Sequence, residues 1–296
     1  TSSVVEDNTK VELVSSDKCF NGYQKIYKHW SKETKCTMKF SIYIPLQLHA
    51  EEKFNAIFFL SGVMCNEQNF IFKTGFQRYA SDERIIFIGP DTSPRNVDLP
   101  GDRDSWVFGR SAGWYLDSTC EPWRTNYRMY SYITRELPEI IRQNFPITGK
   151  FGMCGHSMGG NGAIVCSLRN PTLFQTLSVL APSCNPTSWG DELIYIPYLG
   201  AENRELWKQY DALEVAKAYK GPPKKILADC GSEDEYLHLL LPDKLTEVAL
   251  VNRNVEVELH MREEYNHSYF FVASFIEKHI KYHAKALGTV NENVTC

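Results

Sequence analysis

Residues 154–160 of this chain read Cys-Gly-His-Ser-Met-Gly-Gly and place a serine in the spacing Gly-x-Ser-x-Gly. This spacing is typical of a nucleophile elbow, a sharp turn from a strand into a helix that exposes the serine hydroxyl. Glycines flank the serine because side chains would not fit there. Since the pattern alone arises by chance in about a tenth of chains of this length, the surrounding sequence has to support Ser157 as a nucleophile.

A serine hydroxyl needs a base to take its proton and an acid to orient that base. After such an elbow, the acid comes next along the chain and the base last. His267 fits the base, because it lies between the last expected strand and the closing helix. The acid is expected at the end of the preceding strand, where spacing alone does not choose among four neighbours: Asp229, Glu233, Asp234 and Glu235. The alternative is that all of these are solvated acids of a turn with no catalytic role.

Attack on a carbonyl also needs fixed donors for the negative oxygen that develops. The backbone N–H of Met158, which follows the serine, is one, and the loop at 60–63 after an early strand supplies the second. His156 sits inside the elbow and cannot act as the base for its own neighbour, so it is a candidate pocket residue. His279 and His283 lack a third ligand, and we expect a solvated helix face there rather than a metal site.

Short apolar runs alternate with helical stretches along the whole chain, which predicts an α/β fold with a mostly parallel sheet and helices on both faces. The expected strands are 39–45, which alternates like a half-exposed strand, then 56–60, 85–88, 151–154, 176–180, 225–230 and 255–261. The expected helices are 69–79, 126–145 with a kink at Pro138, 160–168 and 268–286. The long irregular segment 91–122 is expected to wall the pocket.

Composition narrows the class of protein. No linker divides the chain, so we expect one domain over 1–296, with loose ends at 1–15 and 288–296. The net charge of −4 argues against a nucleic-acid partner, and no apolar run approaches the ~20 residues of a membrane span. The polar start is unlike a signal peptide. An odd count of nine cysteines without a Cys-x-x-Cys pair favours free thiols in a reducing, cytoplasmic compartment.

The chain resembles the S-formylglutathione hydrolase (esterase D) family from Lys18 to about Leu287. The resemblance is carried by several segments in order: 60–65, 90–95, 105–109, 112–115, 126–132, 155–160, 185–186 and 267–271. It implies a single-domain α/β-hydrolase fold, a cytosolic homodimer, and cleavage of the small-molecule thioester S-formylglutathione to formate and glutathione in formaldehyde detoxification. It implies no metal and no organic cofactor.

By the same resemblance, the catalytic residues fall on Ser157, Asp234 and His267, which selects one of the four acids. The oxyanion donors fall on the backbone of Met158 and Val63. Cys65 matches a thiol near the site, and the bulky side chains of the long loop are candidate pocket walls: Trp106, Phe108 and Trp114. The chain departs from the family at Val107, where an aspartate is usual, at Val63-Met64 in place of Leu-Thr, and at Asn266 in place of an aspartate.

Two other functions are open at this stage. A general short-chain carboxylesterase would use the same residues on oxygen esters. A non-catalytic interaction protein of the hydrolase fold would commonly lack a member of the triad, whereas this chain keeps all three.

Overall fold

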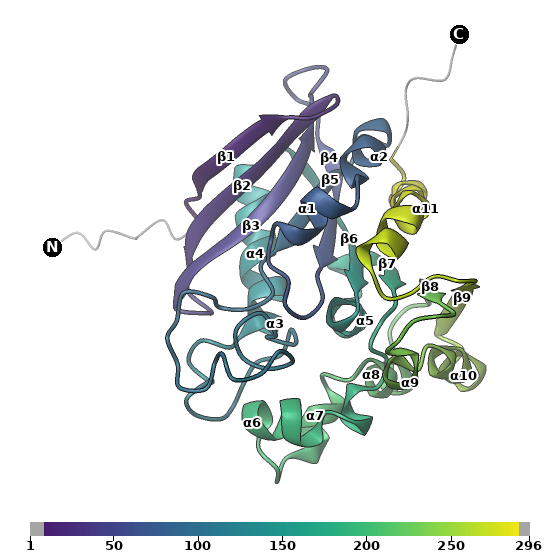
Figure 1. Ribbon diagram of the computed structural model, residues 1–296. Helices are drawn as coiled ribbons and strands as arrows, with labels where there is room; N and C mark the ends of the chain where they lie inside the picture. Colours follow the sequence, from purple (N-terminus) through teal and green to yellow (C-terminus); the bar gives the residue numbers. More distant parts are fainter. Residues whose placement is uncertain (1–8, 290–296) are drawn as a thin grey trace, which may run out of the picture.

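A nine-stranded sheet in the order β1-β2-β3-β5-β4-β6-β7-β8-β9 organises this computed structural model, which describes residues 9–289 (Figure 1). The first three strands pair antiparallel, and β3 also meets β5 antiparallel, while all later pairs are parallel. The strands are β1 Glu12–Lys18, β2 Gly22–Ser31, β3 Cys36–Pro45, β4 Phe54–Leu60, β5 Ile86–Pro90, β6 Ile147–His156, β7 Phe174–Leu180, β8 Lys224–Gly231 and β9 Val255–Arg262.

Helices cover both faces of this sheet (Figure 1). On one face α11 packs over the central strands with α1 and α2 beside it, and on the other α4 and α5 contact the sheet, with α8 against α5. The α-helices are α1 Asn69–Lys73, α2 Phe76–Asp82, α3 Met129–Ser131, α4 Leu137–Asn144, α5 Met158–Arg169, α6 Ile196–Leu199, α7 Arg204–Lys208, α8 Ala212–Ala218, α9 Leu237–Leu240, α10 Asp243–Val251 and α11 Tyr269–Leu287. Short turns of other helix types occupy Tyr132–Glu136, Pro186–Ser188 and Asp191–Tyr195.

The central strand β4 shows why the sheet lies between two layers of helices. All seven of its residues are buried, and successive side chains point to opposite faces. Phe58 meets Phe151 and Phe174 in the core under α5, whereas Phe59 stacks on Phe70 in the core under α11. Burying each such side chain contributes about 1.5–3 kcal/mol, so the apolar run of β4 stabilises both cores at once.

The structure confirms the expected α/β class and the mostly parallel sheet with helices on both faces. The predicted strands all form, but 39–45 is buried on both faces rather than half-exposed, because α2 packs on β3. The predicted helix 69–79 is broken at Gly75, which has φ +63°. The helix expected over 126–145 is a short α3, one π-helical turn and α4, with Pro138 in the first turn of α4.

The ends of the chain were expected to be loose over 1–15 and 288–296. Residues 12–15 instead belong to β1, which pairs with β2. Residue 288 ends α11 in the left-handed conformation. Residues 1–8 and 290–296 lie outside the described part of the chain, so the prediction is not tested there.

His279 and His283 are both buried, so the prediction of a solvated helix face was wrong. His283 stands between two hydroxyls of β7, Thr176 Oγ1 at 2.6 Å from Nδ1 and Ser178 Oγ at 2.8 Å from Nε2. Burial and the charge of His279 lower the pKa of His283 to about 3. Neutral His283 therefore fixes α11 to β7 through two hydrogen-bonding contacts.

We predict that acid destabilises the fold partly through His283. The ordinary pKa of histidine is 6.5, and that of His283 in the folded chain is about 3. At pH values between these two, His283 therefore binds a proton in the unfolded chain but not in the folded chain. The free energy of unfolding should therefore fall with falling pH by about 1.4 kcal/mol per pH unit for this proton. The free energy of unfolding, measured with urea between pH 7 and 5, should depend less steeply on pH in His283→Gln than in the wild type. Replacement of the exposed His49 by Gln should leave this pH dependence unchanged. Equal slopes in wild type and His283→Gln would contradict this assignment.

Candidate active site

Ser157 occupies the sharp turn between β6 and α5, with φ 59° and ψ −122°. A residue other than glycine is strained in this region. The neighbouring glycines are required by contact: a Cβ on Gly155 would lie 2.0 Å from the carbonyl oxygen of Gly159, and one on Gly159 would lie 1.8 Å from that of Leu60. Backbone atoms cannot move away from such a Cβ, so the sequence pattern reflects a real steric constraint.

Ser157, His267 and Asp234 are brought together from three loops at the carboxyl edge of the sheet. His267 Nε2 lies 2.9 Å from Ser157 Oγ, and His267 Nδ1 lies 2.7 Å from Asp234 Oδ2. The other carboxylate oxygen of Asp234 accepts a hydrogen bond from the N–H of Tyr236 at 2.9 Å. The carboxylate is fully buried. This is the geometry of a nucleophile, a base and an acid that orients the base.

The other three acids that the sequence left open have different contacts. Asp229 is buried with Arg262 and His279, and although burial raises its pKa, the hydrogen bonds from these two residues hold that pKa at about 2. Glu235 accepts a hydrogen bond from the backbone N–H of His267 at 3.1 Å, and Glu233 is exposed. Asp234 alone among the four reaches the imidazole ring of His267.

His156 lines the pocket beside the base rather than acting as one. Its ring lies 4.8 Å from that of His267 and 5.5 Å from that of Tyr269, centroid to centroid. Both ring nitrogens are buried, next to the backbone of His267. Burial, with the charge of His267 as a smaller cause, lowers the pKa of His156 well below 6.5. His156 is therefore neutral when His267 takes up a proton.

Met158 and Val63 both line the pocket in front of Ser157. The two segments approach closely, since a Cβ on Gly62 would lie 3.0 Å from the Cβ of Ser157. Within residues 9–289 neither N–H donates to a protein acceptor. Two free donors beside the nucleophile match the requirement for binding an oxyanion.

Arg95 holds the loop that carries Val63, a role that our sequence analysis missed. Its guanidinium donates to both carboxylate oxygens of buried Asp91, at 2.7 and 2.9 Å. It also donates to the carbonyl oxygen of Cys65 at 2.9 Å, and the hydroxyl of Thr92 donates to the same oxygen at 2.6 Å. Arg95 lies within one of the segments that carry the family resemblance, but nothing in its type or spacing indicated this contact.

The pocket in front of Ser157 has a volume of about 620 Å³ and walls that are mainly apolar. The predicted pocket residues Cys65, Trp106 and His156 all line it, as do Val107 and Trp114. Phe108 was expected there and is instead buried against Trp123 and Tyr198. Sequence reasoning missed lining residues from loops without periodicity or from helix ends: Ser183, Trp189, Leu193, Tyr236, Leu239, Leu240 and Tyr269.

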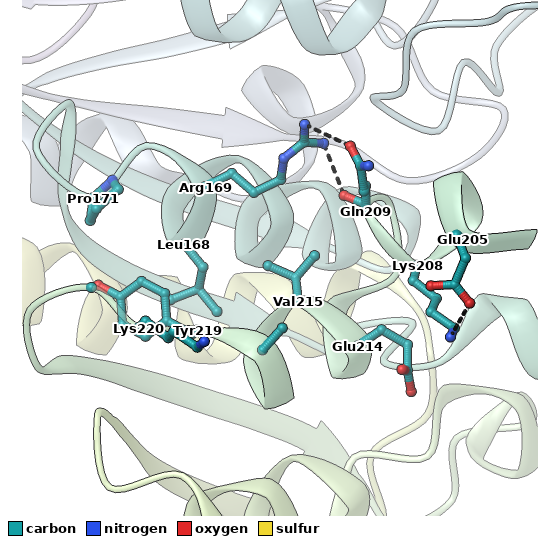
Figure 2. A pocket seen from close by; sticks show the side chains of 12 residues that line it. Leu168, Arg169, Pro171, Glu205, Lys208, Gln209, Glu214, Val215, Tyr219 and Lys220 are labelled. Atoms are coloured by element: carbon teal, nitrogen blue, oxygen red, sulfur yellow. Dashed lines mark hydrogen bonds and ion pairs between the residues drawn. The ribbon is translucent and has the colours of Figure 1, made fainter.

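A second hollow of about 640 Å³ lies elsewhere, lined by side chains of α5, α7 and α8 and the loops that follow α5 and α8 (Figure 2). None of the predicted site residues lines it. Several of its polar groups are paired with one another, as Figure 2 shows: Arg169 donates to Gln209 at 2.9 and 3.4 Å, and Lys208 to Glu205 at 2.6 Å. Its size alone does not make it a site for chemistry.

Within 9–289, no three His, Cys, Asp or Glu side chains are grouped to hold a metal ion. The helices of the same part of the chain are all too short or too polar to span a membrane. The eight cysteines in this part are free thiols, as expected, and Cys296 lies outside it.

Comparisons with known proteins find relatives that cover most of the chain. A family model described as a putative esterase matches residues 31–282. The S-formylglutathione hydrolase of Rattus norvegicus is 46% identical over 94% of this chain and 99% of its own length. That of Arabidopsis thaliana is 42% identical over 93% and 97%. A solved S-formylglutathione hydrolase from Agrobacterium tumefaciens matches with a TM-score of 0.88 at 36% identity, covering 94% of this chain and all of that one.

We predict that Arg95→Met lowers kcat for an aryl ester such as 4-nitrophenyl acetate by about 10- to 100-fold and leaves KM within about twofold. The N–H of Val63 would lose its fixed position, and one oxyanion donor is worth about 100- to 1000-fold in rate. Arg95→Lys should retain only part of the wild-type kcat, because an ammonium group cannot form the bidentate hydrogen bonds that the guanidinium forms with Asp91. Thermal unfolding is the control for folding. A rise in KM with kcat unchanged would contradict the positioning role.

Proposed function

This chain belongs to the S-formylglutathione hydrolase family of esterases, and we propose that it cleaves S-formylglutathione to formate and glutathione. The proposed nucleophile is Ser157, the base is His267, and Asp234 orients that base. The observation that carries the proposal is the continuous hydrogen-bonded series from Asp234 through His267 to Ser157 on the wall of a pocket.

In the first step, Ser157 Oγ attacks the formyl carbon while its proton passes to His267 Nε2. The carbonyl oxygen becomes an oxyanion and lies between the N–H groups of Met158 and Val63. Asp234 remains ionised and stabilises the imidazolium that forms. Because these donors are fixed by the elbow and by the Arg95 contact, they need no rearrangement as charge develops.

The tetrahedral intermediate then breaks its carbon–sulfur bond. Glutathione leaves as a thiol once it has the proton from His267, and the formyl group remains on Ser157. Water attacks the formyl ester, with His267 as base again, and a second intermediate collapses to formate and free Ser157. Neutral His156 beside the base does not oppose the imidazolium in either half of the reaction.

A general carboxylesterase activity is a second candidate, and the pocket itself favours it. The volume of about 620 Å³ far exceeds a formyl group, and Trp106, Trp114 and Trp189 give it aromatic walls. Val107 adds an apolar wall where relatives of this family usually carry an aspartate. Comparing kcat/KM for S-formylglutathione with that for an aryl acetate decides which substrate the enzyme prefers.

We propose further that the enzyme works in formaldehyde detoxification in the cytoplasm, as a single domain over 1–296, and as a homodimer. Free thiols in the described part of the chain fit a reducing compartment. The exposed edge strand β1 and its exposed Leu13 and Val14 offer a surface for a second copy. Sedimentation equilibrium tests the dimer.

We predict that Ser157→Ala abolishes turnover of both S-formylglutathione and 4-nitrophenyl acetate. Removing the nucleophile of a triad costs about a millionfold in kcat. A fluorophosphonate should label the wild type at Ser157 and leave the variant unlabelled, and Ser183→Ala, at another pocket serine, is the matched control for labelling. Residual turnover by folded Ser157→Ala at more than a few per cent would overturn the assignment, and an unlabelled wild type would favour a non-catalytic protein.

A further inference from the structure

The pocket in front of Ser157 contains no lysine or arginine among its lining residues. Glutathione at neutral pH carries two carboxylates and one ammonium group. A mainly apolar wall provides nothing that would attract a carboxylate, and burying one without a partner is costly. If the proposed function holds, the charges of glutathione must therefore be met at the mouth of the pocket.

The proton transfer from His267 determines the side of the pocket on which glutathione leaves. His267 gives its proton to the departing sulfur, so the sulfur lies near His267 Nε2. The aromatic neighbours of the His267 ring are Tyr236 at 5.0 Å and His156 at 4.8 Å. The ring of Tyr269 follows at 5.5 Å from that of His156. All three rings line the pocket in front of Ser157, on the side of the base.

Lys73 lies against the ring of Tyr269, which lines the pocket. It lies in the last turn of α1, is exposed, and holds its ammonium 5.2 Å from the ring centroid of Tyr269. The hydroxyl of Tyr269 lies 3.5 Å from Cys65 Sγ inside the pocket. Because the Tyr269 side chain lines the pocket and contacts Lys73 through its ring, the charge of Lys73 lies beside the pocket wall.

Within residues 9–289, Lys73 forms no ion pair and no hydrogen bond with its side chain. By contrast, Arg95 near the same loop is fully engaged with Asp91, Ser111 and the Cys65 carbonyl. Glu235 is exposed and accepts a hydrogen bond from the backbone N–H of His267 at 3.1 Å. Its negative charge would repel a carboxylate, whereas the unpaired charge of Lys73 would attract one.

We propose that Lys73 binds a carboxylate of the glutathione leaving group and so sets the preference of this enzyme for glutathione thioesters over neutral esters. The inference rests on the proposed function. At about 3.3–3.6 Å per residue, each terminal carboxylate of an extended tripeptide lies roughly 6–9 Å from the central sulfur, so its partner is expected beyond the residues that line the pocket, as Lys73 is. The cation over Tyr269 is held in place by the ring face before substrate arrives.

We predict that Lys73→Gln raises KM for S-formylglutathione by about 3- to 10-fold with kcat within about twofold, the range expected for one partly exposed ion pair. The kinetic constants for neutral 4-nitrophenyl acetate should not change. Lys73→Arg should keep the wild-type KM, and Lys73→Glu should raise it further. The difference between wild type and Lys73→Gln should shrink as salt rises from 0.05 to 0.5 M, because salt screens exposed charges.

Lys25→Gln is the matched control, since Lys25 also places its ammonium over a tyrosine ring, that of Tyr23 at 5.5 Å, but on β2. It should leave every constant unchanged. Inhibition of aryl ester cleavage by S-methylglutathione supplies a second measurement. Its inhibition constant should rise in Lys73→Gln, whereas the bis-amide of the same inhibitor, with both carboxylates neutral, should bind wild type and Lys73→Gln equally.

The outcomes separate this inference from the proposed function. Wild-type enzyme that cleaves aryl esters but not S-formylglutathione would overturn the proposed substrate, and Lys73 with it. Wild-type turnover of S-formylglutathione with an unchanged KM in Lys73→Gln would overturn the role of Lys73 alone. Equal losses for the charged and the neutral substrate would show that the substitution disturbs Tyr269 and not a carboxylate, and would also overturn it.

Discussion

The close contact between the turn after β6 and the end of β4 is the constraint on which the site depends. Gly159 packs against the carbonyl of Leu60 so tightly that no side chain fits, and Gly62 lies close to Ser157, where an added Cβ would be 3.0 Å from the Cβ of Ser157. The two N–H groups proposed to bind the oxyanion come from these two segments. Strain at Ser157 is tolerated because β4 and β6 are buried central strands that cannot relax around it.

The remaining chemistry is supplied by loops at the same edge of the sheet. The carboxyl ends of parallel strands lie at the same edge of the sheet. The loops after β8 and β9 therefore place Asp234 and His267 beside the turn after β6, although the three segments are far apart in the sequence. The buried cluster of Asp229, Arg262 and His279 lies at the end of β8 and ties it to β9 and α11. A structural ion cluster therefore supports the catalytic acid only five residues away.

The sequence predicted those parts that have a local signal. Continuous apolar runs located the parallel strands, and the glycine spacing located Ser157. The strand β1 is exposed along nearly its whole length, so its sequence has no apolar pattern from which it could be predicted. The four acids near the end of β8 could not be told apart by spacing, because only tertiary geometry brings one to the His267 ring. The pocket walls Trp189 and Tyr236 come from loops, and Arg95 acts through a backbone carbonyl, so no periodicity marks any of them.

The wall of the pocket limits which part of a substrate it can hold. Buried polar groups in folded proteins almost always have partners, yet Ser183 Oγ and Trp189 Nε1 have none in the described part of the chain. Both atoms are buried behind the pocket surface, so a substrate reaches them only if side chains move. The wall that a substrate does meet is mainly apolar. In the proposed arrangement this wall therefore holds the uncharged part of the substrate, and the charge of a carboxylate stays outside at Lys73.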